Sequence, residues 1–308
     1  MQVYIYIYSL HLALNIYFLI DVYIETNIFA KEFRINKFHK MYIEYKPNIL
    51  LTPYIETYWT TDEIVSDKQT LRVLPDGSVN VLFNLEENED SFIKPFIPYI
   101  IGVKTKFTDV IHEKADRMIG IRFRPCAISA FTQVPIYEFN DCRINTDLFS
   151  SLFSDFNPEK LIGTSNRISQ LEYIDNYLLS KLGYLHDINK QIIYIAEYIQ
   201  VTKGMVPINE LLNKVCLSQR QFERKFKDLT GMTPKMFSTI TRFSAAEKFI
   251  RLHPDKSLFT IALDCGYYDH SHLIREFKRF SGVLPQMLMS NLYTTSPLFP
   301  YYLCASKK

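Results

Sequence analysis

The spacing of apolar and polar positions changes along this chain and divides it into regions. From Met41 to about Phe139, short apolar or alternating runs are separated by turn residues, a pattern typical of β-strands. The run from Leu71 to Leu74 stops at Pro75-Asp76-Gly77, and Val79 to Leu85 resumes the pattern. We therefore predict a β-hairpin at this turn, within a β-rich region.

Helical spacing begins after Asp147. Leu171, Ile174 and Leu178 recur at intervals of three and four residues, which predicts an amphipathic helix. The pattern stays helical beyond Gly183. We predict an α+β chain with four parts: an uncertain N-terminal extension (1–40), a β-rich domain that also contains helices (41–185), an all-α domain (186–290) and a tail (291–308).

The first forty residues contain an almost continuous apolar run from Val3 to Ile24. About twenty such residues are enough to span a bilayer, so a membrane anchor or signal stays open. The alternating run from Tyr4 to Tyr8 and the start of globular patterning at Met41 instead favour translated upstream sequence that is not part of the natural protein. An ordinary hydrophobic element is the third reading.

An internal repeat near the C-terminus is the most informative feature of the chain. Ser218 opens the segment SQRQFERKFKDLTGMTP, and Asp269 opens DHSHLIREFKRFSGVLP. The apolar positions, the glycine and the proline recur fifty-one positions later, so that Phe222, Phe226, Leu229, Gly231 and Pro234 correspond to Leu273, Phe277, Phe280, Gly282 and Pro285. Two related helical hairpins therefore follow each other.

The second helix of each hairpin carries candidate DNA-binding residues opposite its apolar side. Residues three or four apart share a helix face, so a guanidinium and a hydroxyl or carboxylate can point together toward base edges. These residues are Arg220, Glu223, Arg224 and Lys227 in the first copy, and His270, Ser271, Ile274, Arg275 and Lys278 in the second. We expect Arg224 and Arg275 to contact bases, and Lys227 and Lys278 to contact phosphate. The pattern predicts two helix-turn-helix units that bind double-stranded DNA.

Local signals predict where these helices begin and end. Ser218 and the glutamine three residues later have the form of a capping box, and Thr233 precedes a proline at a helix start. Gly231 and Gly282 stand where helices stop. Between the two copies, Pro234 to about Leu252 predicts one helix of roughly 28 Å. Such a linker helix would hold the two second helices about one DNA turn, roughly 34 Å, apart.

Charge is unevenly distributed along the chain. The 308 residues are 47% hydrophobic and carry a net charge of only +2, but between Lys190 and Ser290 fifteen Lys or Arg stand against nine Asp or Glu, about +6. A basic C-terminal third favours a polyanionic partner. The alternative is a helical bundle whose charged faces are only solvated, and two basic faces at matched register disfavour it.

Other classes of function have less support in the sequence. Without a nucleophile elbow, a phosphate-binding loop or paired carboxylates, we expect no enzyme and no cofactor. Five cysteines without C-x-x-C spacing indicate a reducing, cytoplasmic location and disfavour a metal site; they are Cys126, Cys142, Cys216, Cys265 and Cys304. A ligand-sensing protein without DNA activity and a membrane-tethered regulator stay open as alternatives.

From about Gln191 to Ser290 the sequence resembles the AraC/XylS family of bacterial transcription regulators. The residues that carry the resemblance lie in the connecting helix and the second unit: Arg242, Phe243, Ala246, Ile261, Ala262, Gly266, Tyr267, Ser271, Leu273, Phe277, Lys278, Gly282 and Pro285. This resemblance implies sequence-specific promoter binding through both units, commonly with activation through contact with RNA polymerase.

The first unit departs from the family pattern at two positions. Leu212 stands where a small alanine is usual, and Cys216 stands at the usual turn glycine. A residue with a β-carbon costs about 1 kcal/mol at that turn if its φ is positive. We therefore expect the second unit to have the more typical geometry.

The region before residue 140 resembles, more weakly, a β-rich N-terminal domain found on some of these regulators. The matching residues are Tyr58-Trp59, Arg72 to Gly77, Gly102 and Gly120 to Pro125. This weaker resemblance supplies no ligand, so a small-molecule effector and a homodimer stay open as partners.

Three kinds of side chain in this region have structural explanations that we prefer to a binding role. Asp76 is expected to accept a hydrogen bond from its own turn. Arg122 and Arg124 share a strand face and are expected to pair with acidic residues rather than hold an anion. Trp59 is expected to lie in the core.

Overall fold

The computed structural model describes residues 42–62, 69–86, 93–112, 117–146, 152–164, 166–289, 293–295 and 302–305, which belong to one compact unit. The apolar run from Val3 to Ile24 lies outside the described residues, and its nature stays a prediction. Within the described ranges, no helix combines the length and the apolar character needed to cross a membrane.

The larger sheet has six antiparallel strands in the order β1-β2-β7-β4-β5-β8. Their bounds are β1 Tyr42–Tyr45, β2 Ile55–Asp62, β7 Arg117–Phe123, β4 Asn80–Asn84, β5 Tyr99–Ile101 and β8 Arg143–Asn145. The central strands β4 and β7 are buried on both faces, with Val81 and Ile121 in the main core and Leu82 in a smaller cluster. Trp59 lies in that smaller cluster, as expected for a core residue.

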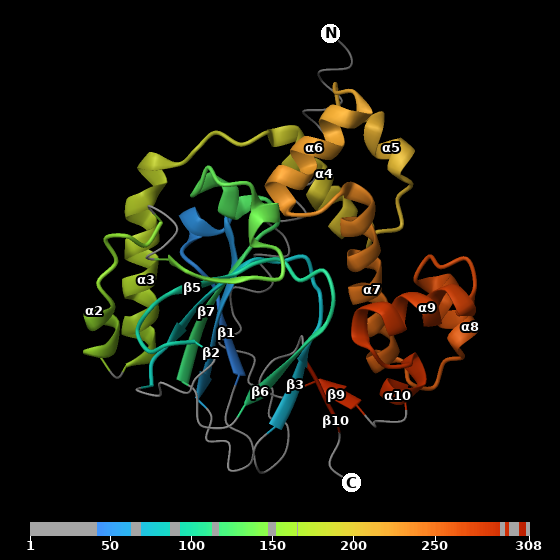
Figure 1. Cartoon of the computed structure of the whole chain (residues 1–308), viewed down its shortest axis with the longest axis horizontal. Coiled ribbons are helices and arrows are strands. Elements are labelled where there is room, and N and C mark those ends of the chain that lie inside the picture. Colours follow the sequence, from blue (N-terminus) through green and yellow to red (C-terminus); the bar gives the residue numbers. More distant parts are fainter. Residues whose placement is uncertain are drawn as a thin grey trace. The chain divides into compact units, whose positions relative to one another are not determined.

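The smaller sheet has four antiparallel strands in the order β6-β3-β10-β9. These are β6 Thr108–His112, β3 Gln69–Val73, β10 Tyr302–Ala305 and β9 Tyr293–Thr295. The last two come from the C-terminal tail, which returns to pair with β3 (Figure 1). No local pattern in the sequence predicted this return.

The predicted hairpin at Pro75-Asp76-Gly77 is wrong. β3 belongs to the smaller sheet, whereas β4 lies in the larger sheet with β7 and β5 on its two edges. Both edges of β4 are therefore occupied by other strands, and the turn passes the chain from one sheet to the other. Its chemistry is still that of a tight turn, because the Asp76 carboxylate accepts a hydrogen bond from the Ser78 amide at 2.9 Å.

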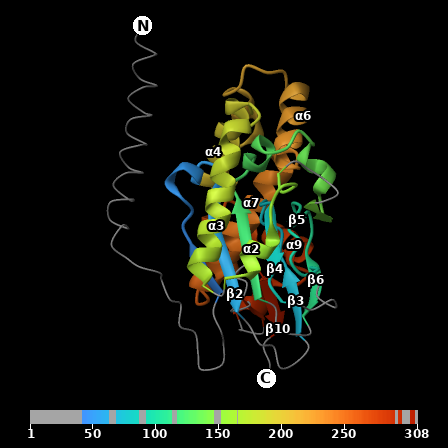
Figure 2. The same ribbon diagram turned by 90° about the vertical axis from the view of Figure 1, so that its left-hand side faces the viewer.

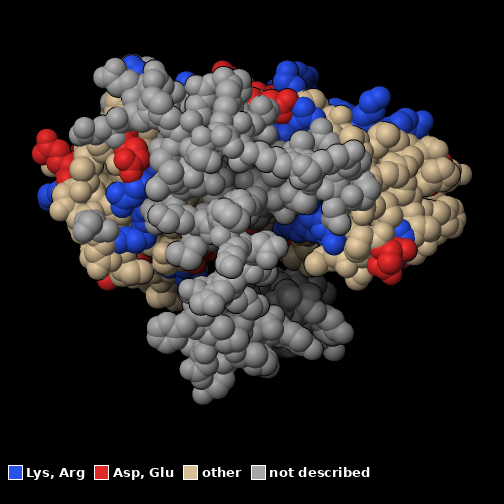
Figure 3. Space-filling view, turned by 90° about the horizontal axis from the view of Figure 1, so that it is seen from below, with Lys and Arg blue, Asp and Glu red and all other residues tan. Residues whose placement is uncertain are grey.

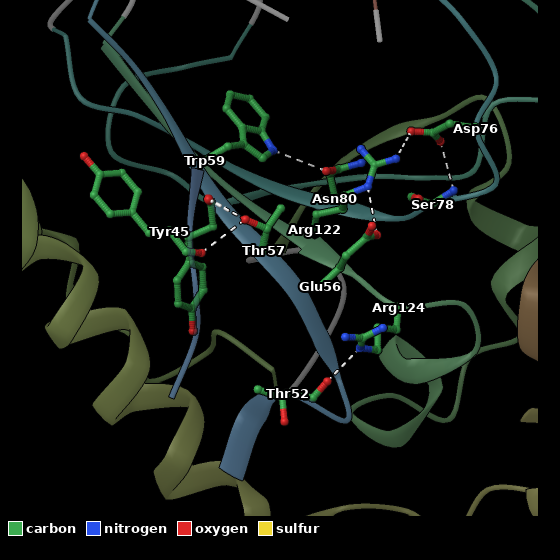
Figure 4. A network of polar contacts seen from close by, with 11 residues as sticks. Tyr45, Thr52, Glu56, Thr57, Trp59, Asp76, Ser78, Asn80, Arg122 and Arg124 are labelled. Carbon is green, nitrogen blue, oxygen red and sulfur yellow. Dashed lines mark hydrogen bonds and ion pairs between the residues drawn. The ribbon is translucent and has the colours of Figure 1, made fainter. Parts of the chain in front are cut away.

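Arg122 holds this turn, whereas Arg124 makes a separate contact with Thr52 (Figure 4). The buried Arg122 guanidinium pairs with the carboxylates of Asp76 and Glu56, the latter at 3.1 Å, as expected. Arg124 instead donates its Nε–H to the carbonyl of Thr52 at 2.7 Å, so the expected acidic partner is replaced by backbone. The contacts of Arg122 fix the turn against β7 and β2 of the larger sheet.

Short helices surround the sheets: η1 Ile49–Leu51, η2 Ala127–Ala130, η3 Ile136–Phe139 and α2 Pro158–Ile162. The longer helix α3 spans Arg167–Lys181 and buries Leu171, Ile174 and Leu178, the stripe predicted from the sequence. Its Asp175 accepts a hydrogen bond from the Tyr58 hydroxyl at 2.6 Å, which ties α3 to β2 (Figure 2). Burial in this position raises the pKa of Tyr58.

The rest of the described chain is helical up to α10. The elements are η5 Leu182–Tyr184, α4 Lys190–Val201, α5 Ile208–Leu212, α6 Gln219–Thr230, α7 Pro234–Leu252, α8 Leu258–Asp264, α9 His270–Ser281 and α10 Pro285–Met289. The bounds of α7 are those predicted for the linker helix. A β-rich N-terminal region followed by a helical C-terminal region confirms the predicted fold class, while the boundary near residue 185 stays a prediction.

Candidate nucleic-acid interface

Helix α6 begins and ends at residues that satisfy its terminal backbone groups. Ser218 accepts from the Gln221 amide at 3.4 Å, and the Gln221 side chain accepts from the Ser218 amide at 3.1 Å, which completes the predicted capping box. Gly231 ends the helix with φ +80°. Phe222 and Phe226 are fully buried beneath the helix, so its opposite face is turned outward.

Helix α9 repeats this design with a different cap. The Asp269 carboxylate accepts from the His272 amide at 2.6 Å, and Gly282 ends the helix with φ +71°. Leu273 and Phe277 are fully buried, at the positions predicted by the repeat. The two helices thus have equivalent starts, stops and buried faces, fifty-one residues apart.

The linker helix α7 packs against both units through aromatic side chains. Its Phe237 ring lies 5.6 Å from that of Phe226 in α6, and its Phe243 ring lies 5.2 Å from that of Phe277 in α9. Thr233 caps the helix and Pro234 occupies its first turn, as predicted. α7 is one continuous helix that connects the two units.

The nine predicted DNA-contact residues lie on the outward sides of α6 and α9. Seven are exposed: Arg220, Arg224, Lys227, His270, Ser271, Arg275 and Lys278. Glu223 and Ile274 are half-buried, and the Glu223 carboxylate accepts from Gln219 at 2.9 Å. On the face drawn in Figure 3, Lys and Arg side chains line the upper right margin, on the side where Figure 1 places the C-terminal helices.

Lys227 differs from its counterpart Lys278. Its ammonium group lies 4.6 Å from the centre of the Tyr137 ring, which belongs to η3 of the β-rich region. A cation held over an aromatic face is less available to a phosphate group. The equivalence of the two lysines that the sequence predicts is therefore broken by the neighbouring domain.

A half-buried polar cluster fixes α9 to the linker helix, and it was not predicted from the sequence. Glu276 of α9 lies 3.4 Å from Arg242 of α7 and 3.2 Å from His272. The Arg242 guanidinium also lies 5.0 Å from the centre of the Tyr267 ring. The i, i+4 spacing of His272 and Glu276 was the one available signal.

The two turns differ as the departures from the family pattern suggested. Gly266 in the second turn has φ +72°, whereas Cys216 does not have a positive φ, so the strain considered for it does not arise. The first connection, from Leu212 to Gln219, has no left-handed residue at Cys216. Leu212 is half-buried and packs against the core.

Two helix-turn-helix units joined by one helix define a domain of the helix-turn-helix class. Residues 211–291 match a helix-turn-helix domain family, and residues 43–145 match a domain family of unknown function. The helix-turn-helix match agrees with the resemblance of this region to the AraC/XylS family of transcription regulators.

Curated relatives share the helical domain. The transcriptional regulator ArgR of Pseudomonas aeruginosa is 28% identical over 109 residues, which are 35% of this chain and 32% of that protein. The transcriptional activator RhaS of Yersinia pestis (strain Pestoides F) is 35% identical over 83 residues, 27% of this chain and 30% of that protein. The similarity spans about a third of the length of these relatives.

Two solved structures share parts of the fold at low identity. ToxT from Vibrio cholerae is 9% identical with a TM-score of 0.39, covering 83% of this chain and 98% of that chain. A xylose-binding transcription activator, XylR, is 18% identical with a TM-score of 0.29, covering 41% of this chain and 39% of that chain.

Proposed function

We propose that this chain is a sequence-specific transcription regulator that binds promoter DNA with α6 and α9 in successive major grooves. The observation that carries the proposal is the equivalence of these two helices in caps, buried face and exposed cationic face. Arg224 and Arg275 contact bases, and Lys278 contacts phosphate. Lys227 contacts phosphate as well, but only when its ammonium group has left the Tyr137 ring.

Footprinting of genomic DNA with the purified full chain first finds the binding site. The affinity of variants with single substitutions on α9 for that site then tests these roles. Arg275→Ala should weaken binding to that site by about 1–3 kcal/mol and relax its preference at one base pair. Lys278→Ala should weaken binding to all duplexes nearly equally and reduce the salt dependence. Arg279→Ala is the matched control, because Arg279 stacks on Phe280 of the same helix.

Either of two results would refute these assignments. An unchanged base preference in Arg275→Ala would show that Arg275 does not contact a base. An altered base preference in Lys278→Ala would show that Lys278 does not act through phosphate alone. A chain that protects no genomic fragment would refute DNA reading altogether and leave a ligand-sensing protein as the alternative.

We further propose that binding activates transcription through contact with RNA polymerase in the cytoplasm. The description of RhaS relatives as activators supports this direction. In vitro transcription from the footprinted promoter, with and without the chain, tests it: a lower transcript yield in the presence of the chain would contradict activation. A small-molecule effector of the β-rich domain and a homodimer stay predictions.

A further inference from the structure

The C-terminal end of α6 is held by two side chains of the β-rich region. Asn140, directly after η3, donates its side-chain amide to the carbonyl of Gly231 at 2.7 Å. Ser129 of η2 donates its hydroxyl to the carbonyl of Leu229 at 3.3 Å. The last carbonyls of a helix have no partner within it, so these donors satisfy groups that would otherwise need water.

The end of α9 is held in the same way from the smaller sheet. Arg72 of β3 donates from Nη1 to the carbonyl of Ser281 at 3.2 Å. Its guanidinium is aimed by Asp109 of β6, which accepts from Nε at 2.6 Å and from Nη2 at 2.7 Å, and it lies 4.4 Å from the centre of the Phe107 ring. A cation at this end also interacts favourably with the helix dipole.

The two contacts are made at equivalent points of the repeat. Gly231 and Gly282 are partners in the fifty-one-residue register, and at both glycines the β-rich region leaves no space for a β-carbon. An added β-carbon would lie 2.6 Å from Asn140 Oδ1 at the first glycine and 2.7 Å from the Phe107 ring at the second. The β-rich region therefore touches both helices at the same place.

A third contact reaches the linker helix between them. Gly77, in the turn that Arg122 and Asp76 hold (Figure 4), lies against the Phe237 ring of α7, which an added β-carbon would meet at 3.3 Å. Val103 of the β-rich region lies in one continuous apolar core with Phe237. Three separate points of the β-rich region thus contact α6, α7 and α9.

We propose that Asn140 and Arg72 are positioning residues that fix the separation of α6 and α9, the two reading helices. The β-rich domain then sets the spacing between the two DNA half-elements to which the protein binds. This inference rests on the proposed function. The Asn140 and Arg72 side chains bind the C-terminal ends of α6 and α9. They leave Arg220, Ser271 and Arg275 exposed. Because recognition helices contact bases mainly through their N-terminal halves, the grip is compatible with reading.

The test uses the full chain and a set of duplexes in which the two half-elements are moved apart or together by one to three base pairs. Asn140→Leu and Arg72→Met keep much of the side-chain volume and remove the donors. Each should reduce the ratio of affinities between the native and the shifted spacings by roughly two- to tenfold, the worth of one such hydrogen bond. Arg117→Met is the matched control, since Arg117 pairs with Glu86 away from the helices, and should leave the ratio unchanged.

The spacing ratio separates positioning from simple stability. A loss of affinity that is equal at every spacing, or an unchanged ratio, would overturn the proposal. Tighter binding at every spacing would also overturn it, because the contacts would then be inhibitory.

Hydrogen exchange without DNA gives a readout that does not depend on the proposed function. In Asn140→Leu the amides of the last turn of α6 should exchange faster, and in Arg72→Met those of the last turn of α9. If the wild-type chain reads no DNA site, the proposed function and the spacing role fail together, and local exchange still shows whether the grip exists. Unchanged exchange in both variants, with intact DNA binding, would show that Asn140 and Arg72 do not hold the helix ends. The proposed DNA-binding function would remain.

Discussion

Replacing Gly282 by alanine tests the contact between α9 and the smaller sheet most directly. The residue has φ +71°, where a side chain costs about 1–2 kcal/mol in backbone strain. Its new β-carbon would also lie 2.7 Å from Arg72 Nη1 and 2.7 Å from the Phe107 ring. Inserting a methyl group into such a packed site costs about 1–3 kcal/mol more. We expect a total destabilisation of about 2–5 kcal/mol.

Gly266→Ala is the matched control for backbone strain. Gly266 has nearly the same φ, +72°, but the atoms nearest to its added β-carbon belong to the flexible Met205 side chain. Met205 is 40% exposed and can shift more easily than the Phe107 ring, so the steric cost added to the strain of about 1–2 kcal/mol is smaller than at Gly282. The difference between the two variants isolates the cost of pushing α9 away from β3.

Urea unfolding of both variants, followed by circular dichroism, measures this difference. The midpoint should fall further for Gly282→Ala than for Gly266→Ala, with little change in the slope. A Gly282→Ala variant as stable as Gly266→Ala would show that the end of α9 is not packed against the β-rich domain. The geometry on which the positioning role depends would then be refuted.

Three further variants test the helix start, the core and an ion pair. Ser218→Ala should cost about 1 kcal/mol of stability by removing the cap of α6, and an unchanged urea midpoint would contradict the capping role. Phe277→Ala should cost about 3–5 kcal/mol because it empties a fully buried ring site beside Phe243, and a smaller loss in the same assay would mean that the site collapses. The hydrogen bonds from Arg72 hold the pKa of Asp109 below its ordinary 3.8, so stability should fall as pH drops through that lowered pKa. Asp109→Asn should remove this acid dependence in unfolding measured from pH 6 downward, and an unchanged profile would show that the ion pair contributes nothing.

The parts of this protein that the sequence predicted well are those fixed by local chemistry. Caps, helix-stopping glycines and three- or four-residue apolar spacing act within a few residues, so the bounds of α7 and the register of α6 and α9 follow from the pattern. The sequence also predicts which faces of α6 and α9 are exposed, because a helix with one buried face leaves only the other for a partner. Which residues contact DNA stays a prediction.

Strand pairing was predicted less well because it is decided by distant parts of the chain. The turn at Pro75-Asp76-Gly77 has ordinary hairpin chemistry, but the strands on its two sides do not pair with each other. β4 pairs with β7 and β5, and β3 pairs with β6 and with β10 of the returning tail. A run of alternating residues does not encode which strand it will join. The same limitation hid the role of the last residues, which supply β9 and β10.

The contacts between the β-rich region and the reading helices show why a helix-turn-helix repeat does not by itself define how DNA is read. Gly231 and Gly282 are fully explained in the sequence as helix stops, yet each also meets a side chain from the β-rich region. Asn140 and Arg72 have no special pattern around them, because they act on partners 91 and 209 residues away. The exposed faces of α6 and α9 thus follow from the repeat, whereas the contacts that we propose fix the distance between these helices come from the β-rich domain.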